Sequence, residues 1–289
     1  LLRNLLFIRE CVQITTEMSC ILTLSEAGVF MSKSPWSPGW FTALMAFLLT
    51  VGTAAPWFAS VLALTAPAVY ADAAESLPED DGAPAAETGQ KLIALTFDDG
   101  PRRSTTTALL DGLAQRGVNA TFFLIGEQLV NNEDVVQRMD AEGHQIGIHT
   151  FDHVKLTGLS KTDFDAQVDK TRQCLLRILG HNDFLLRPPY GMTDQGVKKH
   201  AGCPIILWSV DPEDWRDQNT DRVVREVVAG ARDGGIILMH DIFPESVDAA
   251  LQIVDQLHQQ GYLFCTVDEL FAARGLPLEA GEMYWNAYP

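Results

Sequence analysis

The pattern of residues from Lys91 onward constrains the fold more than any other feature of the chain. Short apolar runs alternate there with longer amphipathic segments, and each run is apolar on both faces, as in parallel strands that helices cover. The seven runs are Leu92–Phe97, Ala120–Ile125, Gln145–His149, Phe184–Arg187, Pro204–Ser209, Ile236–His240 and Tyr262–Thr266. The helical patterns between them are Thr105–Arg116, Asp163–Leu179, Asp221–Arg232 and Val247–Gln260, and glycine, the usual helix stop signal, follows closely after each.

This alternation of strands and helices predicts an α/β fold with a parallel sheet. Seven runs fit a distorted (β/α) barrel of seven or eight parallel strands better than an open sheet. No G-x-G-x-x-G sequence follows the first run, so nothing favours dinucleotide binding. We expect the folded domain to span residues 90–276, with a C-terminal tail at 277–289.

The first 89 residues have a different character. Residues 40–70 carry no charged side chain, and small residues end the apolar stretch. Residues 31–71 therefore fit a signal peptide, with a retained membrane anchor as the alternative; two prolines and the small-residue ending favour cleavage. We interpret residues 1–30 as an upstream extension or a gene-start artefact. Residues 72–89 are rich in Ala, Glu, Asp and Pro and predict a disordered linker. The protein is thus expected to be exported, and to be secreted, cell-wall associated or anchored through residues 40–70.

Composition excludes some partners. The formal net charge is −17, from 38 acidic and 21 basic residues, whereas a nucleic-acid binder normally shows a basic surface. The five cysteines form no C-x-x-C pair, which argues against a disulfide framework and against a cysteine zinc site. We infer no nucleic acid and no obligate protein partner. Contact with a membrane is expected only through an uncleaved leader.

The polar motifs fall directly after predicted strands, and the carboxyl ends of barrel strands form the active face in folds of this type. Asp98 and Asp99 end the first strand, where two carboxylates repel unless a cation or a shared proton relieves them. The alternative is an ordinary turn with an Asp as helix cap. His149 and His153 are four residues apart and can share one divalent metal, on a helical turn or a curled loop. With Asp99 they form a two-histidine, one-carboxylate set that leaves positions open, as catalytic sites do.

Three further motifs carry candidate residues. Arg187 ends the fourth strand, and its charge can pair with an acid in the pocket or lie on the surface of a Pro-Pro loop. The prolines stiffen the next residues, so that the N–H of Tyr190 could face a developing oxyanion. In the sequence DPEDW, Asp211 could orient an imidazole and Trp215 could pack on a sugar ring. His240 ends an apolar strand, either as a core histidine or as a working group at the mouth of the barrel.

The motifs TFDDGP, HTFDH, RPPYG, DPEDW and LMH occur in this order. Together they resemble the polysaccharide deacetylase family, carbohydrate esterase family 4, with its NodB-homology domain. The resemblance covers roughly 91–274. The stretch HDIFPESVDAALQIVDQLHQQGY looks closest to the peptidoglycan deacetylases of bacteria.

The resemblance implies a role for each matching residue. The catalytic set is Asp98 as general base, Arg187 holding that base, Tyr190 contributing its backbone N–H, Asp211 tuning the catalytic histidine and His240 as general acid. The metal ligands are Asp99, His149 and His153, and the substrate pocket contains Pro188, Tyr190, Trp215 and Leu238, with Leu238 receiving the acetyl methyl group. The cofactor implied is one divalent metal ion, zinc in the first place, with cobalt, nickel or manganese as alternatives.

The activity implied is metal-dependent removal of N-acetyl groups from the amino sugars of a polysaccharide, peptidoglycan above all, with release of acetate. Chitooligosaccharides or O-acetyl-xylan are alternative substrates. An alternative from another class is a non-catalytic glycan-binding domain on the same fold, which would need neither a base nor an acid. The absence of H-E-x-x-H from the sequence disfavours a metalloprotease.

Overall fold

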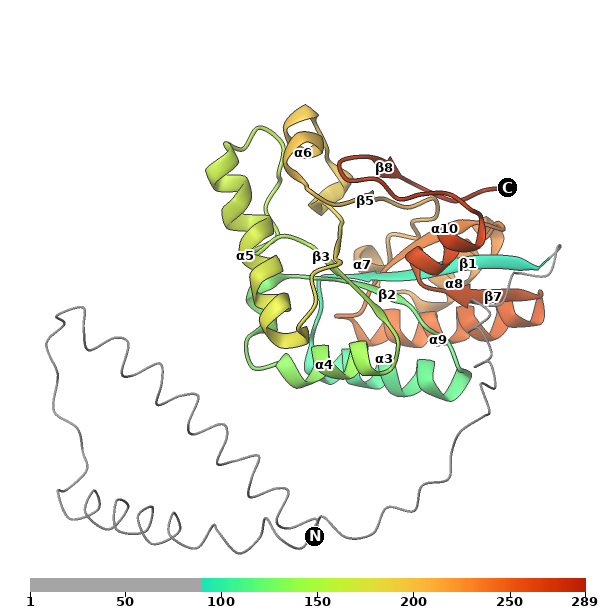
Figure 1. Cartoon of the computed structure of the whole chain (residues 1–289). Coiled ribbons are helices and arrows are strands. Elements are labelled where there is room, and N and C mark those ends of the chain that lie inside the picture. Colours follow the sequence, from blue (N-terminus) through green and yellow to red (C-terminus); the bar gives the residue numbers. More distant parts are fainter. Residues whose placement is uncertain (1–89) are drawn as a thin grey trace, which may run out of the picture. The chain divides into compact units, whose positions relative to one another are not determined.

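The structure is a computed structural model that describes residues 90–289 (Figure 1). The expected leader, linker and upstream extension, residues 1–89, lie outside the described residues. The strands are β1 (Lys91–Asp98), β2 (Thr121–Leu124), β3 (Gln145–Ile148), β4 (Leu185–Leu186), β5 (Ile205–Ile206), β6 (Gly235–His240), β7 (Tyr262–Cys265) and β8 (Met283–Tyr284). The helices are α3 (Arg103–Arg116), α4 (Glu133–Ala141), α5 (Lys161–Leu179), α6 (Gln195–His200), α7 (Asp214–Asp217), α8 (Thr220–Gly230), α9 (Pro244–Gln259) and α10 (Val267–Ala273), with 3-10 turns η3 (Gly126–Leu129) and η4 (Pro189–Gly191).

The eight strands form one parallel sheet that curls into a distorted barrel. Their order is β6-β1-β2-β3-β4-β5-β8, and β7 pairs with the first half of β1. Two isolated bridges join the two sides of the curl: Val210, after β5, pairs with Ile237 of β6, and Asn286, after β8, pairs with Gly235 of β6. The predicted fold class is confirmed, and each of the seven predicted apolar runs contains a strand.

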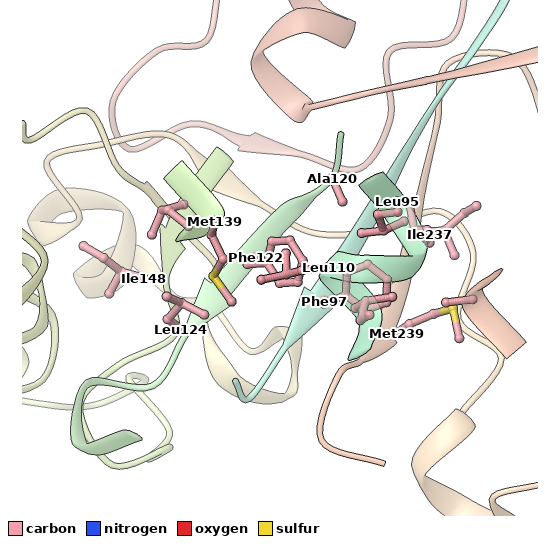
Figure 2. Close-up of a cluster of buried hydrophobic side chains, with 14 of the residues drawn as sticks. Leu95, Phe97, Leu110, Ala120, Phe122, Leu124, Met139, Ile148, Ile237 and Met239 are labelled. Carbon is pink, nitrogen blue, oxygen red and sulfur yellow. The ribbon is translucent and has the colours of Figure 1, made fainter. Parts of the chain in front are cut away.

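The alternation of side chains along β1 divides the core into two apolar layers. Leu95 and Phe97 point to the layer that helices α3, α4 and α9 cover (Figures 1 and 2). In that layer the rings of Phe97 and Phe122 stack with their centroids 5.2 Å apart (Figure 2). Leu92 and Ala94 point the other way, into a smaller layer that α10 covers. The same alternation places Thr96 and Asp98 on the face of β1 that carries Leu92 and Ala94. Polar groups therefore lie on this face at the carboxyl end of β1.

The helix ends follow the sequence signals. Gly117 and Gly180 cap α3 and α5 in the left-handed conformation, with φ of 61° and 83°, which glycine adopts without steric cost. Helix α9 begins earlier than predicted, at Pro244, because proline is favourable in the first helical turn. The C-terminal stretch 277–289 was expected to be a tail outside the domain, and this is wrong. Strand β8 of this stretch pairs with β5, and Ala287 is buried in the smaller apolar layer.

Within residues 90–289, the structure contains no helix that combines the length and the apolar character needed to span a bilayer.

Candidate active site

Arg187 and Asp98 form a buried ion pair at the carboxyl end of the barrel. Arg187 is fully buried, and its Nη1 donates to Asp98 Oδ1 at 2.8 Å and to Thr96 Oγ1 at 2.7 Å. Its other donors reach the backbone oxygens of Ile206 and Leu207 at 3.2 and 3.1 Å. A buried charge is stable only when it is paired and its donors are used, and both conditions are met here. Arg187 therefore holds Asp98 and does not lie on the surface.

The three expected metal ligands converge beside this pair. Asp99 Oδ1 lies 3.5 Å from Nε2 of His149 and 3.4 Å from Nε2 of His153. One ligand atom from each residue lies within 4.8 Å of the others. Ligand atoms about 2.1 Å from a shared tetrahedral ion would be roughly 3.4 Å apart, so these separations suit a single ion.

The donor chemistry of the cluster also fits a cation. The Nδ1 of the buried His149 lies 2.7 Å from the carbonyl oxygen of Arg187, which can only accept, so Nδ1 carries the proton. Burial lowers the pKa of His149, and the neutral ring then turns the lone pair of Nε2 toward the carboxylates. Asp99 Oδ1 is buried and has no hydrogen-bond partner. Several acceptors thus face one another without a proton between them, which a bound divalent cation would relieve.

The loops that carry the ligands have an unusual backbone. Asp99, Thr150 and His153 have φ of 73°, 66° and 60°, and Tyr190 has φ of 62°, which side chains other than glycine rarely adopt. Such conformations persist where the surrounding structure enforces them, commonly at functional sites. His149 and His153 accordingly lie on a curled loop after β3 and not on a helical turn.

His240 lies beside Asp98, because the two residues are register partners on the adjacent strands β6 and β1. Its Nδ1 is 2.7 Å from Asp214 Oδ1, and its backbone N–H donates to Asp214 Oδ2 at 2.9 Å. Burial alone would lower the pKa of His240, but the hydrogen bond and charge of Asp214, with the charges of Asp98 and Asp99, raise it to about 9. Its Nε2 remains free and lies 4.0 Å from Asp99 Oδ2. His240 is therefore a cation at neutral pH.

The expectation that Asp211 orients this imidazole is wrong, since the side chain on Nδ1 is Asp214. Asp211 instead accepts a hydrogen bond from the backbone N–H of Glu213 at 2.8 Å. Glu213 then turns the chain in the left-handed region, with φ of 46°, and Asp214 starts helix α7 directly afterwards. This turn buries Asp214, which is 1% exposed, under the end of β6.

The expected pocket residues occupy different depths around the site. Leu238 is buried and lies on the same side of β6 as His240, two residues earlier. Pro188 is buried and lies two residues after the end of β4. Tyr190 and Trp215 are half or more exposed, and the Tyr190 ring meets the ring of His153 edge to face at 4.9 Å.

Two contributing residues were missed from the sequence, Asp214 and Thr96. The signal for Asp214 was its place next to Trp215, in an acidic motif in which Asp211 was preferred. Thr96 could have been found from strand alternation, which puts it on the same face as Asp98. Its hydroxyl accepts from Arg187 and donates to the carbonyl oxygen of Ile237 at 2.6 Å.

Comparison with known proteins identifies the family of the chain. The chain matches the family model described as polysaccharide deacetylase over residues 85–202. The peptidoglycan-N-acetylglucosamine deacetylase PgdA of Listeria monocytogenes is 41% identical over 217 residues, which cover 75% of this chain and 45% of that protein. The structure of the peptidoglycan deacetylase PdaC from Bacillus subtilis is 40% identical with a TM-score of 0.63, and the match covers 65% of this chain and 93% of that one.

A family 4 acetyl xylan esterase from Clostridium thermocellum, solved with a cobalt ion, is 30% identical with a TM-score of 0.65, over 68% of this chain and 98% of that one. The chain belongs to the polysaccharide deacetylase family. It spans less than half the length of the Listeria relative that it matches.

Proposed function

We propose that this chain is a metal-dependent hydrolase that removes N-acetyl groups from the amino sugars of peptidoglycan and releases acetate. The observation that carries the proposal is the pairing of two proton-transfer groups across one metal-ligand cluster. Asp98 is held by Arg187 on one side, and His240 is held by Asp214 on the other. The Listeria and Bacillus relatives named as peptidoglycan deacetylases support the choice of glycan.

The metal we propose is zinc, held by Asp99, His149 and His153. Mixed histidine and carboxylate ligands suit zinc and also accept cobalt, nickel or manganese. A divalent ion held there would polarise the acetyl carbonyl and lower the pKa of the attacking water.

Asp98 acts as the general base in this proposal. Its Oδ1 is bound by Arg187, whereas its Oδ2 lies 3.6 Å from His149 Nε2 and so borders the metal-ligand cluster. Oδ2 is thus the oxygen that takes the proton of the attacking water. The fixed charge of Arg187 keeps Asp98 in position.

His240 acts as the general acid. An amine is a poor leaving group unless its nitrogen is protonated during bond cleavage. Asp214 engages Nδ1, so the proton available to the substrate nitrogen is the one on Nε2, on the side of Asp99. Cleavage of the carbon–nitrogen bond then leaves acetate and a free amino sugar, and the proton taken up by Asp98 can restore His240.

The remaining residues hold the substrate. The backbone N–H of Tyr190 stabilises the developing oxyanion, a role that its inverted backbone conformation supports. Leu238 and Pro188 form the apolar floor for the acetyl methyl group, and the exposed Trp215 provides a face for the sugar ring.

We also propose that the protein is exported, through a signal peptide or anchor at residues 31–71. An extracytoplasmic location would bring the site to cell-wall glycans.

The test is acetate release by the full chain loaded with zinc, from N-acetylglucosamine oligomers, peptidoglycan fragments and O-acetylated xylan in parallel. The proposal expects release from the N-acetylated substrates, with peptidoglycan fragments preferred. Release from O-acetylated xylan alone would contradict amide hydrolysis. Binding of all three without release would support the glycan-binding alternative.

A further inference from the structure

The loop that carries Asp214 is bound by the guanidinium of Arg222, which lies on helix α8. The Nη1 of Arg222 donates to the carbonyl oxygen of Pro212 at 2.6 Å, and its Nη2 donates to the carbonyl oxygen of Glu213 at 3.1 Å. Its Nε and Nη2 also donate to the two carboxylate oxygens of Asp217, at 2.9 and 2.7 Å. The planar guanidinium of Arg222 thus binds the chain at both ends of helix α7.

The donors of Arg222 are fully used and its helix is fixed to the core. Nη1 makes a second hydrogen bond, to Glu226 Oε2 at 2.7 Å, so each of the N–H groups of the guanidinium has an acceptor. The side chain is only 15% exposed, and the adjacent Val223 and Val224 are buried in the large apolar layer. Arg225, on the same helix, is exposed. Arg222 is therefore held in place and can hold the loop in turn.

Helix α7 is too short to keep this loop in shape by itself. It has four residues, far fewer than a helix needs to be stable alone. Glu213 and Gln218, at its two ends, have φ of 46° and 51°, which residues other than glycine rarely adopt. Such conformations persist where the surrounding structure enforces them. The hydrogen bonds of Arg222 supply that support from outside the loop.

The turn at Glu213 selects the carboxylate that reaches His240. Asp211 and Asp214 are three residues apart, so in an extended chain their side chains would point to opposite sides. The turn interrupts this alternation. It buries Asp214 against Nδ1 of His240 and leaves Asp211 bonded to the N–H of Glu213. Relaxing the turn would therefore move Asp214 away from the imidazole.

We propose that Arg222 is a positioning residue that holds the turn at Glu213 and thereby keeps the carboxylate of Asp214 on Nδ1 of His240. Arg222 acts on the reaction through Asp214 and takes no part in bond cleavage. The inference rests on the proposed function for the role of His240 as general acid. It goes beyond that function by assigning the support of the acid to a side chain on α8.

The first measurement is independent of catalysis. The proton shared by Nδ1 of His240 and Asp214 should give a far-downfield signal in the proton NMR spectrum of the full chain at about pH 7, and His240→Gln identifies the signal by its absence. We expect the signal in the wild type and in Arg225→Met, the matched control on the same helix. In Arg222→Met it should disappear or move upfield, because Asp214 no longer holds the proton.

The second measurement is kcat for acetate release in a double-mutant cycle. A misplacement of about 1 Å can cost up to about 100-fold in rate, so kcat of Arg222→Met should fall by about 10-fold at about pH 8, and by no more than kcat of Asp214→Asn. In the Asp214→Asn background the same change should alter kcat by less than about twofold, because its effect passes through Asp214. A general loss of structure would instead lower kcat equally in both backgrounds.

Thermal melting checks that each variant is folded. If Arg222→Met does not fold, Asp217→Ala replaces it, because it removes a partner of the guanidinium that is 42% exposed, and the same pattern is expected with a smaller decrease. An unchanged proton signal in the folded variant, or equal losses of kcat in both backgrounds, would overturn the positioning role. A signal that depends on Arg222 in a protein that releases no acetate would uphold the role and count against the proposed reaction.

Discussion

Replacing Asp214 by asparagine should remove the cationic form of His240 at working pH. The rise of the pKa of His240 from 6.5 to about 9 corresponds to about 3 kcal/mol in favour of the imidazolium. Asp214 is the first of the groups that oppose burial, so without its charge the pKa of His240 should fall from about 9 toward its ordinary value of 6.5. Asparagine keeps the size of the side chain and can still accept from Nδ1.

The direction of the pH effect depends on which protonation state of His240 is active. The acid must be protonated, so wild-type kcat should hold through neutral pH and be lost as pH rises through about 9. In Asp214→Asn the loss should occur at a lower pH, between 6.5 and 9. At pH 8 about nine tenths of wild-type His240 would be cationic, against about 3% with a pKa of 6.5, so kcat should fall by up to about 30-fold.

The assay is acetate release at saturating substrate from pH 5 to pH 10, with thermal melting to confirm folding. Asp211→Asn is the matched control, because its carboxylate contacts the Glu213 N–H and does not occupy the imidazole nitrogen. That variant should keep the alkaline limb of the wild type. The reasoning would be refuted by an Asp214→Asn profile that still declines near pH 9, or by an Asp211→Asn profile in which the limb moves instead.

Three other perturbations address the rest of the site. Asp98→Asn should lower kcat by about 10²–10⁴-fold while one metal per chain is retained, and full activity in metal-loaded protein would exclude Asp98 as the base. Arg187→Met should destabilise the fold by about 3–5 kcal/mol in urea unfolding, because it leaves the Asp98 charge buried and unpaired, and the added change Asp98→Asn should restore much of that loss. His153→Ala should weaken zinc binding by more than the roughly 10–100-fold typical of losing an outer-shell partner, measured by competition with a chelator; unchanged affinity would remove His153 from the ligand set.

The fold could be predicted where the sequence is periodic. β1 and β6 are apolar on both faces and long enough to be recognised, and the glycines after α3 and α5 mark helix ends. β8 could not be found this way, because two residues carry no period and its pairing with β5 depends on tertiary contact. The short helix α7 could not be predicted from the sequence either, because its start depends on a left-handed turn at Glu213 that no local pattern requires.

The site could be located from the rule that strand ends converge, and Asp98, Asp99, His149, Arg187 and His240 do meet there. The carboxylate that contacts the imidazole of His240 could not be identified by this rule. The motif DPEDW offers three acids within four positions, and only the turn at its centre decides which carboxylate reaches the ring of His240.

The central claim is that one bound divalent ion and the Asp98–His240 pair hydrolyse an N-acetyl group. The most direct measurement is acetate release from an N-acetylglucosamine oligomer by the full chain with one zinc bound, after chelation, and after zinc is restored. We predict release that stops on chelation, returns with zinc, and yields one free amine for each acetate. Release that continues unchanged in metal-free protein would contradict the account.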